Sequence, residues 1–158
     1  MIIFGVDPGY GRTGWGVINW EKPKASYVAC GLIETLPNIE FCLRIGQIYK
    51  ELNRLIKLYK AEAMAIETLY FNKNVKTAIL AAHARGVAVL AGVEAEIPVT
   101  DYTPLQIKNA LIGYGRGSKD QIKKMLELQL EVKGVFDQDD AADGVACALT
   151  HALNRKAW

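Results

Sequence analysis

Four carboxylates lie at the ends of predicted secondary-structure elements, which restricts how those elements can be arranged. Asp7 and Glu67 each follow a run of apolar residues, and Asp140 and Asp143 open an alanine-rich segment with the pattern of a helix. The last two are three residues apart and therefore share one helical face. A carboxylate at the end of a buried strand costs free energy unless a positive charge pairs with it. The four side chains predict a site for Mg²⁺ or Mn²⁺, and with it metal-dependent phosphodiester hydrolysis.

Each carboxylate also has a structural explanation, and these explanations are unequal. Asp7-Pro8-Gly9 is a common turn tripeptide, and acidic residues in a first helical turn favour the helix dipole. Glu67 fits such a role poorly, because glutamate is a weak strand former that here ends an apolar run. Small residues, Gly144 and Cys147, continue the helical face that carries the two aspartates and allow a close approach to a sheet. Together the four residues favour a metal site over four separate structural roles.

Length and cysteine content bound the class of protein. A chain of 158 residues predicts a single domain, since it can bury about two thirds of its unfolded surface. No apolar stretch is expected to approach the ~20 residues that span a bilayer, and the N-terminus has no secretion signal. The three cysteines are isolated, which indicates a reducing cytoplasm and argues against a zinc or disulfide framework.

The charge distribution is more informative than the net charge. The formal net charge is +2. If bound metal neutralised the four carboxylates, the rest of the chain would carry a charge of +6. Basic residues gather in the segment 108–133, namely Lys108, Arg116, Lys119, Lys123, Lys124 and Lys133. Such a run fits a polyanion partner, and a solvated helix face gives the same pattern.

The hydrophobic pattern predicts a mixed five-stranded sheet with helices on both faces. Strands are expected at 2–7, 13–20, 26–35, 63–67 and 97–100, the first three forming a meander. Apolar spacings of three and four predict helices at 41–59 and 75–94, and a last helix is expected at 139–154. Capping sequences at 103–106 and 118–121 predict two further helices.

Five motifs, in order and at matching spacings over nearly the whole chain, resemble those of the RuvC family of Holliday junction resolvases. They are Val6-Asp7-Pro8-Gly9, Ala65-Ile66-Glu67, Asn72-Lys73-Asn74, Ala84-Arg85-Gly86-Val87 and Asp140-Ala141-Ala142-Asp143-Gly144. The resemblance implies an α/β, ribonuclease-H-like nuclease domain over residues 1–158. It implies a homodimer that cleaves four-way DNA junctions by paired symmetric nicks in homologous recombination and DNA repair.

The same resemblance assigns roles to individual residues. It places catalysis and metal binding at Asp7, Glu67, Asp140 and Asp143, with two Mg²⁺ ions per subunit that Mn²⁺ can replace. It also implies partnership with a branch-migration motor complex of the RuvA–RuvB type.

Five residues are candidates for DNA binding. Lys108 and Lys119 match lysines that the family uses against the DNA backbone, and Arg116 is placed to reach a second phosphate. Tyr70 and Phe71 could stack on an unpaired base at the junction centre or pack on the edge of the sheet. Tyr70 matches the position of the stacking aromatic in the family.

Three other interpretations stay open. The segment from Asp7 to Gly14 resembles the first phosphate loop of the actin and sugar-kinase superfamily, whose members need two such domains to clamp a nucleotide. A nuclease of the same fold acting on another structure, such as an RNA precursor, is compatible with the same residues. A catalytically inactive junction-binding module is the third, and four intact carboxylates argue against it. His83 is predicted to be a helix-surface or dimer residue, and His151 to lie too far from the carboxylates to join them.

Overall fold

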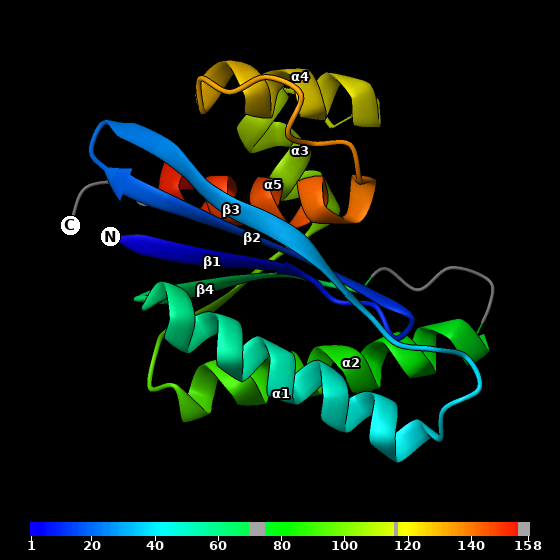
Figure 1. Cartoon of the computed structure of the whole chain (residues 1–158). Helices are drawn as coiled ribbons and strands as arrows, with labels where there is room; N and C mark the ends of the chain where they lie inside the picture. The colour runs from blue at the N-terminus through cyan, green and yellow to red at the C-terminus, as the bar shows by residue number, and fades with distance from the viewer. Residues whose placement is uncertain (70–74, 116, 155–158) are drawn as a thin grey trace.

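In the computed structural model, which describes residues 1–69, 75–115 and 117–154, the strands form one five-stranded sheet in the order β3-β2-β1-β4-β5. The strands are β1 (Ile2–Asp7), β2 (Arg12–Glu21), β3 (Lys24–Glu34), β4 (Ala63–Glu67) and β5 (Val99–Tyr102). The helices are α1 (Phe41–Tyr59), α2 (Val75–Glu94), α3 (Pro104–Ile112), α4 (Lys119–Gln129) and α5 (Asp139–Asn154). Helices α1 and α2 cover one face of the sheet, and α5 covers the other with α3 and α4 outside it (Figure 1). The predicted mixed sheet with helices on both faces is confirmed.

Strand direction decides where the carboxylates meet. The first three strands form an antiparallel meander, whereas β1 and β4 are parallel, with Val6 opposite Ile66. Parallel neighbours end at the same edge of a sheet. Asp7 and Glu67, each the last residue of its strand, are therefore brought to one edge.

The sheet separates two hydrophobic cores. Side chains alternate between the faces of β1, so that Ile3 packs towards α5 while Phe4 packs towards α1 and α2. The α5 side includes Leu126 and Leu149, and the other side includes Leu52. Each helical layer thus has its own core, and both are anchored on the same strands.

Helix α5 lies unusually close to β1 and β2 because glycines face it. A Cβ added at Gly14 would lie 1.7 Å from the backbone oxygen of Asp140, and one at Gly5 would lie 2.0 Å from that of Gly144. A Cβ on Gly144 itself would lie 2.6 Å from the backbone carbon of Trp15. The expected close approach of this helix is confirmed, and it fixes the depth at which the first turns of α5 sit against the sheet.

Both predicted capping boxes are present. Thr103 Oγ1 accepts from the Gln106 N–H at 3.2 Å, and Ser118 Oγ accepts from the Gln121 N–H at 3.2 Å. In each case the glutamine side chain accepts in turn from the backbone N–H of the capping residue. The starts of α3 and α4 are thus fixed by local sequence.

Two expectations were wrong in detail. The last strand is Val99–Tyr102, not 97–100, because the Ile97 N–H donates to the Gly92 oxygen at 3.2 Å and closes the end of α2. The second concerns α2, which is long and apolar enough to cross a membrane by length and composition alone. A single such helix in the described part of the chain is weak evidence for a span; 22% of its apolar window is buried inside the protein, including Ala88 and Ala91, and the rest faces outwards.

Candidate active site

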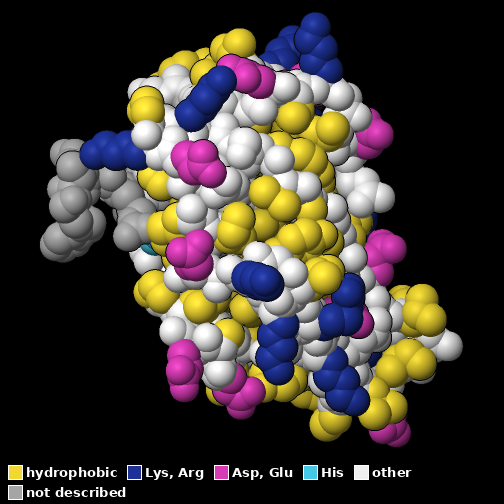
Figure 2. Space-filling view, turned by 60° about the vertical axis from the view of Figure 1, so that its left-hand side comes forward, with side chains coloured by type: hydrophobic (Ala, Val, Ile, Leu, Met, Phe, Trp, Pro, Cys, Tyr) yellow, Lys and Arg dark blue, Asp and Glu magenta, His cyan; other side chains and the backbone are white. Residues whose placement is uncertain are grey.

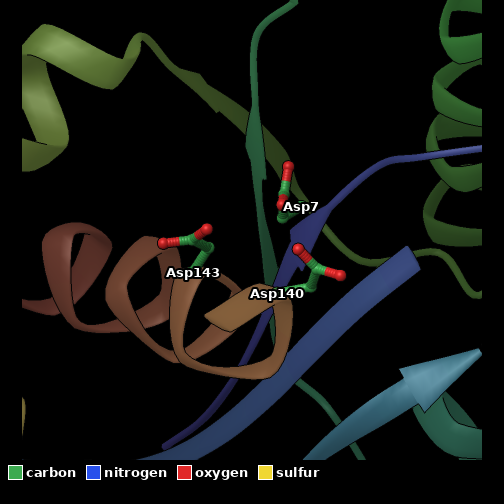
Figure 3. Close-up of side chains that lie close together, drawn as sticks. All are labelled: Asp7, Asp140 and Asp143. Carbon is green, nitrogen blue, oxygen red and sulfur yellow. The ribbon is translucent and has the colours of Figure 1, made fainter. Parts of the chain in front are cut away.

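Three aspartates converge where β1 ends. Asp7 comes from that strand, and Asp140 and Asp143 come from the first turns of α5 (Figure 3). One carboxylate oxygen from each lies within 4.8 Å of the others. Two oxygens bound to one Mg²⁺ at about 2.1 Å are at most about 4.2 Å apart. Small side-chain adjustments therefore suffice for this acidic trio to share an ion.

Glu67 lies outside the acidic trio but at the same cavity. This cavity, of about 280 Å³, is lined by Asp7, Glu67 and Asp143 together with Lys108 and Lys119. Its apolar wall is formed by Pro104, Ile107 and Ile122 of α3 and α4. Carboxylates and lysines thus share one partly enclosed space.

Burial and mutual repulsion make the carboxylates reluctant to ionise. Burial, followed by the neighbouring charges of Asp143 and Asp140, raises the pKa of Asp7 to about 7. Burial and the charge of Asp7 raise the pKa of Glu67 to about 8. Burial also raises the pKa of Asp143, against the lowering effect of Lys119. Partly buried acids that repel one another in this way fit a bound divalent cation, which relieves the repulsion.

Without metal, the protein is expected to lose stability as the pH rises from about 4 to about 8. In the unfolded chain Asp7 and Glu67 ionise near the ordinary pKa values of 3.8 and 4.5, whereas in the folded protein their pKa values are about 7 and about 8. The folded state therefore binds more protons across this window, and rising pH favours the unfolded state. Melting temperatures in chelator at pH 5 and pH 8 measure the loss.

Mg²⁺ or Mn²⁺ should restore that stability, and more at pH 8 than at pH 5. The control is a variant with all four acids neutralised, which should melt at nearly the same temperature at both pH values and gain nothing from metal. An undiminished metal response in this control would place the ions elsewhere.

Lys119 pairs with the acidic trio. Its Nζ lies 3.3 Å from Asp143 Oδ2 and 3.8 Å from Asp139 Oδ2. Lys119 is the first residue of α4 and follows the capping residue Ser118, so its backbone is firmly held. A lysine at the start of a helix opposes the helix dipole, and here its charge has the carboxylate of Asp143 as an anionic partner.

Arg12 is a site residue that sequence reasoning missed. Its Nε lies 3.2 Å from Asp140 Oδ2 and 3.4 Å from Glu34 Oε1. The antiparallel register sets Gly14 opposite Asp7, so Arg12 begins β2 just beyond the end of β1. The available signal was the short turn between Asp7 and Arg12, which returns the chain to the same edge.

Neither histidine belongs to the acidic trio. His83 is exposed on α2, with its ring 5.0 Å from that of Phe41. His151 is buried, and its Nδ1 lies 3.0 Å from the Tyr102 hydroxyl. The predicted DNA contacts Tyr70, Phe71 and Arg116 lie outside the described residues.

The opposite end of the molecule has a different surface. Figure 2 turns forward the side that lies to the left in Figure 1, away from the end of β1. There, acidic and basic side chains are interspersed around exposed hydrophobic surface (Figure 2). Lys and Arg side chains also gather in the lower part of this view, so basic surface is not confined to the lysines beside the acidic trio (Figure 2).

Comparison with known proteins gives matches over nearly the whole chain. The model of the family "Crossover junction endodeoxyribonuclease RuvC" matches residues 3–151. The crossover junction endodeoxyribonuclease RuvC of Ruminiclostridium cellulolyticum is 42% identical over 156 residues, 99% of this chain and 94% of that protein. The corresponding protein of Alkaliphilus oremlandii is 44% identical, over 96% of this chain and 93% of its own length.

Solved structures agree with the sequence matches. The Thermus thermophilus RuvC in complex with a Holliday junction substrate superposes with a TM-score of 0.92 at 31% identity, covering 97% of this chain and 93% of that one. The yeast mitochondrial Holliday junction resolvase Ydc2 shares the fold, with a TM-score of 0.69 at 11% identity. The matched region contains all four carboxylates, and the ribonuclease-H-like fold implied by the sequence motifs is confirmed.

Proposed function

Because the chain belongs to the RuvC family of crossover junction endodeoxyribonucleases, we propose that it resolves Holliday junctions by paired, symmetric, metal-dependent nicks. The observation that carries the proposal is the acidic trio beside a cavity that also holds Glu67 and two lysines. The setting is homologous recombination and DNA repair, and the domain is the single nuclease unit 1–158.

The four carboxylates would hold the metal. Asp7, Asp140 and Asp143 offer oxygens close enough to share an ion, and Glu67 offers a further ligand at the same cavity. Two Mg²⁺ ions, or Mn²⁺ in their place, would supply a water of lowered pKa and charge stabilisation for the leaving 3′ oxygen. The partly buried carboxylates are positioned by β1, β4 and α5, and Pro104, Ile107 and Ile122 line the cavity with them. No covalent intermediate is needed.

Cleavage of a mobile four-way junction, compared with duplex DNA and an RNA–DNA hybrid, tests this function. We expect metal-dependent nicks in two opposite strands of the junction and little cleavage of the other two substrates. Preference for a structured RNA precursor would favour the alternative nuclease. Binding of the junction without cleavage at any metal concentration would favour an inactive binding module.

Lys108 and Lys119 are proposed to bind phosphates. Both line the cavity with the carboxylates. Phosphate contacts of this kind contribute affinity and register but little base specificity. Arg116, Tyr70 and Phe71 remain proposed contacts from the sequence, the aromatic pair for an unpaired base at the junction centre.

Lys108→Ala and Lys119→Ala should each weaken junction binding and reduce the salt slope by about one unit per lost phosphate contact. The measurement is a salt titration of binding in chelator. Lys57→Ala, an exposed lysine on the opposite face of the sheet, is the control and should leave the slope unchanged. Normal binding by either cavity variant at all salt concentrations would show that the DNA face is assigned wrongly.

Helix α2 is proposed to form the dimer interface. The side chains of Val75, Ile79, Leu90 and Val93 are 46–68% exposed and recur at helical spacing with Ala82 and Gly86 on the same face. An apolar stripe of this length in water indicates a partner surface. A two-fold dimer would place two active sites on opposite strands of a symmetric junction.

Gly86→Trp should weaken this dimer and uncouple the two nicks while leaving metal binding intact. A Cβ at Gly86 meets nothing within 4 Å, so a larger side chain can leave the helix there without a clash at its first atom. Gly46→Trp, at an equally open position on α1, is the matched control. Sedimentation reports the oligomeric state, and single-turnover cleavage reports coupling. A monomer that still cuts both strands in concert would contradict the arrangement.

A branch-migration motor of the RuvA–RuvB type is proposed as a partner, and the cytoplasm as the location. The first rests on family membership and the second on the isolated cysteines, of which Cys42 is exposed. Co-purification of tagged protein with motor subunits, before and after DNA damage, tests the partnership.

A further inference from the structure

The turn that follows Asp7 holds the backbone of Arg12 firmly. A Cβ on Gly9 would lie 2.2 Å from the Arg12 oxygen, so the turn is tightly closed. The Thr35 N–H donates to the Gly11 oxygen at 3.0 Å, and its hydroxyl donates to the Tyr10 oxygen at 2.6 Å. Arg12 therefore starts from a fixed backbone position beside the acidic trio.

A buried arginine braces the same turn from behind. The Arg44 Nε donates to Thr35 Oγ1 at 2.9 Å, and its guanidinium lies 3.8 Å from the centre of the Tyr10 ring. This bracing concerns the backbone of the turn and leaves the side chain of Arg12 exposed to solvent.

The ion pairs of Arg12 are weak explanations for its presence. Both contacts, at 3.2 Å to Asp140 and 3.4 Å to Glu34, use the same Nε atom, and the side chain is 52% exposed. Exposed pairs of this kind contribute little to stability. Within residues 1–69, 75–115 and 117–154, no acceptor is hydrogen-bonded to its terminal nitrogens. A guanidinium with its planar fork uncommitted is suited to bidentate contact with a phosphate.

Two cations thus flank the acidic trio from different elements. Arg12 reaches Asp140 from β2, and Lys119 reaches Asp143 from α4. Each of these cations forms an ion pair with a carboxylate that is proposed to bind metal. Added positive charge at the acidic trio would weaken the attraction of each cation for its carboxylate and favour its transfer to a nearby anion.

We propose that Arg12 is a DNA-contacting residue that exchanges Asp140 for a backbone phosphate when the junction binds, an exchange that metal at the acidic trio assists. Without the junction, the charge of Arg12 partly neutralises the acidic trio. With the junction bound, its guanidinium binds a phosphate from the β2 side of the site, while Lys119 binds from the α4 side. This inference rests on the proposed function.

Arg12→Gln separates this role from a merely structural one through two measurements that need no cleavage. In chelator, a salt titration of junction binding should show several-fold weaker affinity and a slope reduced by about one unit. Without DNA, the Mn²⁺ concentration at half-maximal thermal stabilisation should fall several-fold, because a competing positive charge is removed. If Arg12 only held Asp140 in place, the slope would be unchanged and more Mn²⁺ would be required.

Two control variants sharpen the test. Arg54→Gln removes an exposed arginine paired with Glu51 on α1, on the other face of the sheet, and should change neither measurement. Arg12→Lys keeps the charge and should recover the salt slope. An unchanged slope in Arg12→Gln, or an increased Mn²⁺ requirement, would overturn the inference. Cleavage of the mobile junction by the wild-type protein is measured alongside. If the wild-type protein does not cleave it, the proposed function itself is contradicted. If the wild-type protein cleaves it and Arg12→Gln behaves like the wild type in both measurements, only the role of Arg12 is contradicted.

Discussion

Glu67→Gln, Asp7→Asn and Asp140→Asn are each expected to lower the rate of junction cleavage by a factor on the order of 10³ or more. Each change removes a negative ligand atom while keeping the size of the side chain. Junction affinity should hold or improve, because negative charge close to phosphate is lost. Single-turnover cleavage at saturating protein measures the chemistry, and binding in chelator measures affinity separately.

Asp137→Asn is the matched control for the carboxylate variants. Asp137 is exposed shortly before α5 and lies outside the acidic trio, so the rate should be nearly unchanged. Retained turnover in Glu67→Gln would contradict the assignment of Glu67 as a metal ligand. That assignment rests on the position of Glu67 at the cavity, since the residue lies outside the acidic trio. Equal losses in the control and the site variants would indicate a general effect of charge.

Gly14→Ala should be the most damaging single change away from the carboxylates. Its Cβ would lie 1.7 Å from the Asp140 oxygen, so α5 must shift or the strand must bend. Overpacking of this kind costs about 1–3 kcal/mol or more. A misplacement of about 1 Å at a catalytic group can reduce the rate by roughly 10²-fold. We expect both a lower melting temperature and a lower rate of cleavage.

Gly46→Ala provides the control for glycine substitution. This helical position on α1 is open, and alanine there should be neutral or stabilising by about 0.5–1 kcal/mol. If Gly14→Ala melts and cuts like the wild-type protein, the tight contact between α5 and β2 does not set the position of Asp140. A stable variant with reduced cleavage would separate placement of the helix from stability.

Local sequence was sufficient for most of the fold. The amphipathic spacing of α1 and the two capping boxes depend on residues within a few positions of one another, and both were read correctly. The meander was predictable because short turns leave antiparallel pairing as the simple arrangement. Asp7 and Glu67 lie at one edge because β1 and β4 are parallel neighbours. The sequence predicted a mixed sheet, and a mixed sheet contains such a parallel pair.

Contacts between distant segments were beyond such reasoning. Arg12 meets Asp140 across more than a hundred residues of chain, and no periodicity relates the two. Strand β5 begins and ends two residues later than predicted, at Val99–Tyr102, because the Ile97 N–H is hydrogen-bonded to the end of α2. The large exposed apolar side chains of α2 could not be singled out for a similar reason, since its apolar composition is equally typical of a buried helix.

The two separate cores have a consequence for how such an enzyme can diverge. Asp140, Asp143 and Lys119 belong to the layer of α4 and α5, whereas the apolar stripe of α2 belongs to the layer on the other face. Substitutions that reshape α2 would alter the distance and angle between the two subunits of the proposed dimer while each set of carboxylates stayed as it is. The spacing between two cuts could therefore drift to suit junctions of different shape, with the bond-breaking chemistry inherited unchanged.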